Sequence, residues 1–132
     1  MFANHMNARL SLVFLLLGSI SGWAAEAAAP RFENLASFLS WADKKLTADD
    51  YDALITAQAD SKDTRETKLA SIQKLDADIG KQKLAKIFEG RVFPKDATTF
   101  TLGGHKKELG HCHIDFSKDG DSWRIAGIWQ CR

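Results

Sequence analysis

The stretch that most restricts the fold of this chain lies near its C-terminal end, where two runs with a period of two flank an Asp-Gly pair. ELGHCHIDFS and SWRIAGIWQC each alternate apolar and polar residues, and SKDGDS lies between them. Such alternation is typical of a β-strand with one buried face. Asp-Gly favours a tight turn, because both residues tolerate a positive φ. The sequence therefore predicts an antiparallel hairpin with one apolar and one polar face.

Placing Asp119-Gly120 at the turn sets the register of this hairpin: Phe116 then faces Trp123, and Asp115 faces Arg124. Opposite charges directly across an antiparallel pair attract, so we expect a salt bridge between Asp115 and Arg124. The apolar face predicts the core residues of the sheet, which are Phe116, Trp123, Ile125 and Trp129, together with Cys112, Ile114 and Cys131. The polar face carries His111, His113, Asp115, Ser117, Arg124, Ala126, Ile128 and Gln130.

The residues before the hairpin show helical spacing instead. RFENLASFLSWADKKL repeats apolar residues every three or four positions, and further segments with this period follow as far as Gly90. After Gly90 the period changes, and ATTFTL suits another strand. This order predicts an α+β domain, with three or four helices at about 31–90 and an antiparallel meander of at least three strands at about 91–132.

Residues 1–27 have the pattern of a secretory signal peptide. Arg9 precedes an apolar run that ends at Ile20, and small residues follow it. The run is shorter than the roughly 20 apolar residues that a membrane-spanning helix needs. Cleavage is expected after Ala24, Ala25 or Ala27, which leaves 28–132 as one domain in the periplasm or outside the cell. The mature chain is not expected to insert into a membrane; the alternative is a retained N-terminal anchor helix.

The two cysteines, Cys112 and Cys131, allow two interpretations. An even count in an oxidising compartment predicts one disulfide. The expected register opposes it, because Cys112 pairs with Gly127, about 13 Å along the strand from Cys131, whereas bridged Cα atoms lie within about 7 Å. A β-bulge at Gly110 or Gly127 would close that gap. The alternative is a buried Cys112 and a free Cys131, which could also be used between chains.

A metal site is the most specific functional hypothesis that the residues offer. His111 and His113 project from one face of a single strand, a spacing that can chelate Zn²⁺ or Cu²⁺. His105 or Glu108 would supply a third ligand if the preceding turn folds over. The alternative is a pair of surface histidines, and no other cofactor is expected.

An acid/base site is the second hypothesis, because a carboxylate such as Asp115 can orient a histidine such as His113. A catalytic pair needs a pocket that excludes water, however, and this face is expected on the outside of the sheet. Arg124 also competes for Asp115. The sequence therefore favours a protein that is not an enzyme.

Charge and motifs exclude several other classes. The 18 basic and 17 acidic residues are interspersed and give a net charge of +1, so nothing indicates a nucleic-acid partner. The sequence contains no phosphate-binding loop, dinucleotide fingerprint or G-x-S-x-G motif.

The order of a helix with F-x-x-L-x-x-F-L-x-W, a helix pair and a meander ending in DGDSWRIAGIWQCR resembles NTF2-like (cystatin-like cone) exported bacterial proteins. That group includes small domains of unknown function and NTF2-fold immunity proteins, and the match lies mainly in Gly110–Arg132. The resemblance implies a curved sheet wrapped on helices, often with a pocket that His/Asp pairs line in the enzymes. In this chain the histidines and Asp115 alternate with apolar residues, so no catalytic role is carried over.

The sequence thus predicts an exported, non-enzymatic binding or inhibitory (immunity-type) module of the cell envelope, with a protein partner or a small ligand that is unknown. The alternative is a metal- or small-ligand-binding NTF2-like protein that uses His111 and His113. A hydrolase or dehydratase of that superfamily is a third option.

Overall fold

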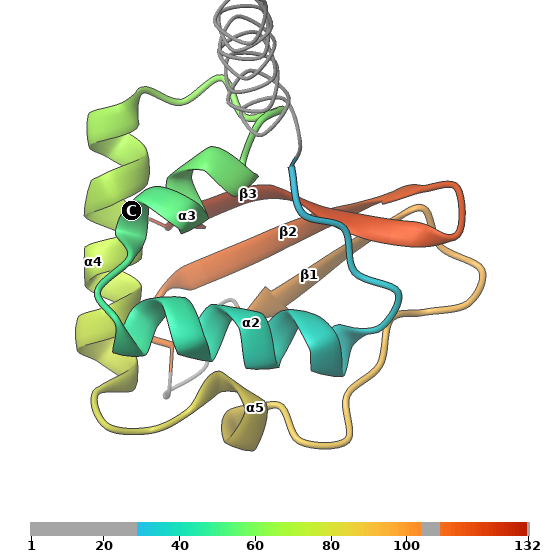
Figure 1. The fold of residues 1–132 in the computed structure, drawn as a ribbon, viewed down its shortest axis with the longest axis horizontal. Helices are drawn as coiled ribbons and strands as arrows, with labels where there is room; N and C mark the ends of the chain where they lie inside the picture. The colour runs from blue at the N-terminus through green and yellow to red at the C-terminus, as the bar shows by residue number, and fades with distance from the viewer. Residues whose placement is uncertain (1–28, 104–108, 132) are drawn as a thin grey trace, which may run out of the picture.

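The computed structural model describes residues 29–103 and 109–131, and in this part of the chain four helices precede a three-stranded antiparallel sheet (Figure 1). The helices are α2 (Leu35–Thr47), α3 (Tyr51–Ala57), α4 (Arg65–Ile79) and α5 (Leu84–Ile87). The strands are β1 (Thr99–Gly103), β2 (Cys112–Asp119) and β3 (Ser122–Gln130), in the order β1-β2-β3. The predicted α+β class is therefore confirmed, and the sheet is open rather than closed.

Two sequence predictions fall outside the described residues: the signal peptide at 1–27, and the candidate third metal ligands His105 and Glu108. None of the helices that the structure describes combines the length and the apolar character required to cross a bilayer.

Side-chain caps explain where the longer helices begin. The Asn34 side chain accepts a hydrogen bond from the Ser37 amide at 2.8 Å, and the Thr64 hydroxyl accepts one from the Thr67 amide at 3.2 Å. Each bond satisfies an amide that has no partner within its helix, which fixes the starts of α2 and α4. Gly80 follows α4 with a φ of 59°, a conformation that glycine adopts without strain.

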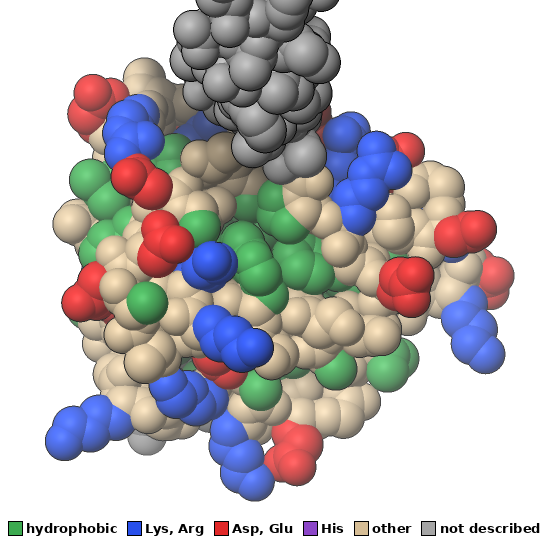
Figure 2. All heavy atoms as spheres, in the orientation of Figure 1, with side chains coloured by type: hydrophobic (Ala, Val, Ile, Leu, Met, Phe, Trp, Pro, Cys, Tyr) green, Lys and Arg blue, Asp and Glu red, His purple; other side chains and the backbone are tan. Residues whose placement is uncertain are grey.

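The core lies between the helices and one face of the sheet, where α2 lies below the strands in this view and α4 runs along their ends (Figure 1). Phe116 of β2 is at its centre. Its ring meets Phe38 of α2 edge-on, with 4.7 Å between the centroids, and Phe93 with 5.1 Å. Trp123 of β3 stacks on Phe93 at 4.6 Å. Figure 2 shows apolar side chains reaching the surface near the middle of the helical side, with charged side chains around them.

The register of the hairpin differs from the predicted one. Asp119 pairs with Ser122, so the turn residues are Gly120 and Asp121, and Phe116 pairs with Ile125 rather than with Trp123. Gly120 has a φ of 65°, as the first central residue of a type II′ turn requires. Because this shift moves the pairing by two residues, it leaves the same residues on the apolar face.

The predicted inward and outward residues are wrong for the second half of β3, because the strand contains a β-bulge. The register shifts between Asp115 and Phe116, so that Ala126 is an extra residue on β3. An extra residue reverses which side chains point inward beyond it. Ile128, expected on the polar face, is 1% exposed, whereas Trp129, expected in the core, is 38% exposed.

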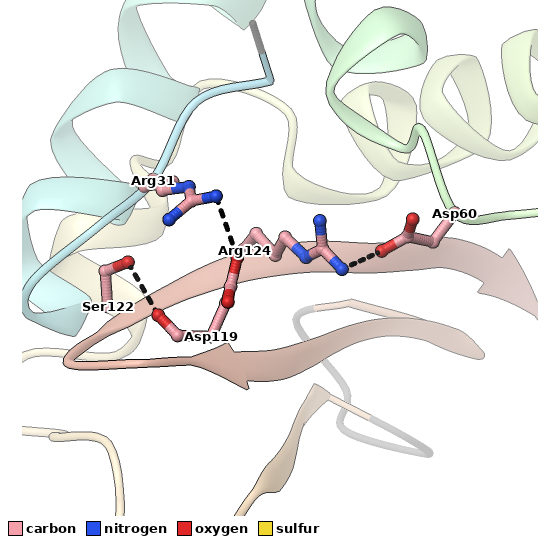
Figure 3. Close-up of polar contacts among 5 residues, drawn as sticks. All are labelled: Arg31, Asp60, Asp119, Ser122 and Arg124. Carbon is pink, nitrogen blue, oxygen red and sulfur yellow. Dashed lines mark hydrogen bonds and ion pairs between the residues drawn. The ribbon is translucent and has the colours of Figure 1, made fainter.

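The edge of β3 that faces away from β2 is covered by two segments of the chain, one around Phe32 and one around Gln58. Phe32 exchanges two backbone hydrogen bonds with Trp123, both of 2.8 Å. The buried Gln58 side chain accepts a bond from the Ile128 amide at 2.9 Å. Two ion pairs lie near these contacts: Arg31 binds Asp119, and Arg124 of β3 binds Asp60 (Figure 3). The Trp123 amide and carbonyl and the Ile128 amide on this edge are thus paired within the chain, which leaves fewer backbone groups for pairing with another chain.

Candidate functional site: the outer face of the sheet

The sheet face that points away from the helices, which we call the outer face, carries side chains that are exposed or half-buried. They come from all three strands and alternate with the buried core residues. The outer face consists of Thr99, Thr101, His113, Asp115, Ser117, Asp119, Arg124, Ala126 and Trp129. It combines hydroxyl groups, two carboxylates, one guanidinium group, one imidazole and one large aromatic ring.

Trp129 is held in one orientation by two neighbours on β2. Its Nε1 donates a hydrogen bond to Asp115 Oδ2 at 2.7 Å, and its ring stacks on the His113 imidazole with 4.0 Å between centroids and 5° between planes. Asp115 Oδ1 accepts a second bond, of 2.7 Å, from the Thr101 hydroxyl on β1. A single polar cluster therefore connects the three strands and fixes the exposed indole.

The expected salt bridge between Asp115 and Arg124 is not formed. The observed register places Arg124 opposite Ser117, two residues from Asp115. The Arg124 guanidinium instead reaches across the edge of β3 and binds Asp60 at 2.8 Å (Figure 3). Asp115 consequently orients the Trp129 indole with one oxygen and binds Thr101 with the other, which argues against its use as the orienting carboxylate of a His113 acid/base pair.

No disulfide joins Cys112 and Cys131, which corrects the first interpretation of the cysteines. The bulge at Ala126 places Gln130, rather than Cys131, in register with Cys112. Because side chains alternate along the strand, Cys131 lies on the same outer side as Trp129. Cys112 instead lies in the core with no exposed surface. Burial, with Asp78 and Asp115 adding negative charge, raises the pKa of the Cys112 thiol to about 12.

Cys131 is half-buried and contacts a histidine. Its Sγ lies 2.6 Å from His113 Nε2, and its backbone amide donates to the His111 carbonyl at 2.9 Å. A cavity of about 540 Å³ opens beside it, between the start of α4 and the end of β3. Alternation alone does not predict this contact, because it places Cys131 on the inner face.

The metal hypothesis stays a prediction. His111 lies exposed in the turn before β2, and His113 points along the outer face toward Cys131. Within residues 29–103 and 109–131, no group of three or more His, Cys, Asp or Glu side chains is arranged to hold a metal ion.

Tyr51, the only tyrosine of the chain, gives a clean test of local electrostatics. Its hydroxyl donates to Asp76 Oδ2, and this bond, followed by burial and the Asp76 charge, raises the pKa of Tyr51 to about 12 from 10.0. We expect tyrosinate absorbance to rise with a midpoint near that value, and Asp76→Asn to move the midpoint down toward 10.0. Because the folded pKa exceeds the unfolded one, the stabilisation by this hydrogen bond is present below pH 10 and is lost as the pH rises toward 12. Asp78→Asn, on the same helix, is the control and should leave the midpoint unchanged.

Comparison with protein-family models, with curated proteins and with solved structures found no match for this chain. The NTF2-like relationship therefore stays a prediction from the sequence.

Proposed function

We propose that the chain is a non-enzymatic binding module that docks the outer face of its sheet on a folded protein partner. The observation that carries this proposal is Trp129, which is 38% exposed and yet fixed by Asp115 and His113. Binding an already ordered side chain avoids much of the entropy that a mobile one would lose. Tryptophan is also one of the residues that most often dominate the affinity of protein interfaces.

The charge distribution around Trp129 supports the same function. Asp115 accepts two hydrogen bonds within the outer face, and Arg124 is paired with Asp60 at the edge of the sheet. The remaining groups are mostly hydroxyls, such as those of Thr99 and Ser117, which are neutral. The cores of protein interfaces are enriched in aromatic residues, and the charged groups Asp119 and Arg124 of this face are already paired with Arg31 and Asp60. The expected partner therefore offers an apolar recess for the indole and hydrogen-bonding groups around it.

The signal peptide expected at 1–27 would place this module in the cell envelope or outside the cell, where an inhibitory or immunity-type role is one form of such binding. The curved sheet and pocket of an NTF2-like domain are not required for it, because the proposed surface is the exposed side of the sheet.

The test compares the two large apolar side chains that are exposed in the described part of the chain, Trp129 and Val92. With a purified partner identified by crosslinking, calorimetry should show that Trp129→Ala weakens binding by about 2 kcal/mol, or roughly thirtyfold in Kd. Val92→Ala should have little effect, since Val92 is 73% exposed and lies between α5 and β1, outside the outer face. Equal affinities for the wild type and Trp129→Ala would reject the outer face as the docking surface.

A further inference from the structure

The contact between Cys131 and His113 brings a nucleophile and a base together. Cys131 Sγ and His113 Nε2 are 2.6 Å apart, within the reach that transfer of a proton requires. We infer that Cys131 is a reactive thiol that exchanges with small cationic disulfides, and that His113 accepts its proton. This reactivity is independent of the proposed docking function, because it needs no protein partner.

The two cysteines of the chain are opposite cases. Cys112 has no exposed surface, and the rise of its pKa to about 12 keeps it as a protonated thiol, which is a poor nucleophile. Cys131 is half-buried on the outer side and has an imidazole nitrogen against its sulfur. Cys112 therefore serves as the internal control for any reaction at Cys131.

The cavity next to Cys131 indicates which disulfides would reach it. It measures about 540 Å³, and Trp129 and Gln130 of β3 form one side of it. Asp63 and Glu66, at the start of α4, form part of the other, and the described lining residues include no lysine or arginine. Two carboxylates beside the thiol attract a positively charged reagent and repel a negatively charged one.

Other titratable groups near the pair come from β2 and from the turn before it. His111 contributes its carbonyl to the Cys131 amide, and the Asp115 carboxylate lies on the same face, where it binds Thr101 and Trp129. His113 is the group whose ring nitrogen lies against the sulfur, so we assign the proton to it.

The reaction is an ordinary thiol–disulfide exchange. As Cys131 Sγ attacks one sulfur of the reagent, its proton passes to His113 Nε2, a new S–S bond forms, and the original S–S bond breaks. The departing thiolate takes the proton back from the imidazolium. Cys131 is thereby oxidised to a mixed disulfide, while one half of the reagent is reduced to a thiol.

The first experiment incubates the full, folded chain with cystamine, a dicationic disulfide, and follows adducts by intact-mass and peptide mass spectrometry. One adduct on Cys131 and none on Cys112 is expected, and Cys131→Ser should abolish the reaction. His113→Ala should slow it by about tenfold or more, and free imidazole should restore part of the rate. Since His113→Ala also removes the ring beneath Trp129, His113→Phe keeps an aromatic ring there and should be equally slow.

The second experiment tests the charge of the cavity. Glutathione disulfide, which is anionic, should react more slowly than cystamine, and the difference should shrink in high salt or in a variant with Asp63→Asn and Glu66→Gln. The inference is overturned if Cys112 is modified in the folded chain, if no adduct forms at Cys131, or if both His113 variants react at the wild-type rate. Equal rates for the two reagents would overturn the assignment to cationic disulfides.

Discussion

Phe116→Ala is expected to lower the free energy of unfolding by about 3–5 kcal/mol, the range for a large aromatic side chain removed from a packed core. Phe116 is 1% exposed and lies at the centre of the aromatic cluster. Its ring contacts Phe38 of α2 and Phe93 of the segment before β1, so the substitution leaves a cavity where the helices meet the sheet. Relaxation around the cavity cannot recover these contacts, because backbone pairing with both β1 and β3 fixes the position of β2.

Urea unfolding monitored by circular dichroism measures this loss. Phe100→Ala is the matched control, since Phe100 belongs to the same sheet but is only partly buried and its ring lies farther from Phe116, at 6.2 Å between centroids. The control should lose clearly less stability than Phe116→Ala. Equal losses in the two variants would contradict the central position of Phe116 in the core.

The alternation of apolar residues predicted the buried face of the hairpin only as far as Ile125. Up to that residue, the inward side chains of β3 agree with a period of two, and a turn shifted by two residues does not change them. Ala126 then adds one residue, and the pattern reverses. Gly127 indicated a possible β-bulge here, and the extra residue is its neighbour Ala126. The alternation alone does not show that the bulge forms; the burial of Ile128 against the helices, a tertiary effect, decides the outcome.

The same bulge limited what could be predicted of the outer face. The sequence placed His113 and Asp115 there, and the structure has them there, but the alternation does not reveal their partners. Trp129 and Cys131 reach the outer side only because of the extra residue on β3. The partner of Arg124 was missed for another reason: Asp60 lies in a loop between two helices, and sequence spacing does not reveal a contact over that distance.

Gln58→Glu is expected to destabilise the fold by several kcal/mol at neutral pH, because it places a carboxylate where an amide is fully buried. Gln58 Oε1 accepts from the Ile128 amide at 2.9 Å, which a carboxylate oxygen could also do. Its Nε2, however, donates to the Leu54 carbonyl at 3.1 Å, and an ionised Glu would set two acceptors against each other there. The Lys68 ammonium, which donates to the backbone carbonyl of Gln58 at 3.1 Å, offsets only part of this cost.

The loss should depend on pH in a defined direction. Burial raises the pKa of the introduced carboxyl above the value of about 4.3 that it has in the unfolded chain. A group with a raised pKa in the folded state binds its proton more tightly there, so stability is greatest at low pH and falls as the pH rises through the folded pKa. Protonated, the new side chain can donate to Leu54 much as the amide does. Unfolding free energies of Gln58→Glu measured at several pH values should therefore approach those of the wild type only in acid.

Gln58→Met separates the charge from the loss of hydrogen bonds. It has a similar volume, leaves the Ile128 amide without its acceptor, and should cost about 1–3 kcal/mol at every pH at which the wild type is stable. Gln130→Glu is the control: it introduces the same carboxylate at a half-buried position at the end of β3, and it should change the free energy of unfolding little. If Gln58→Glu followed Gln58→Met across the pH range, the introduced carboxylate would have to be solvated, and the Gln58 side chain could not be the buried cover of the β3 edge.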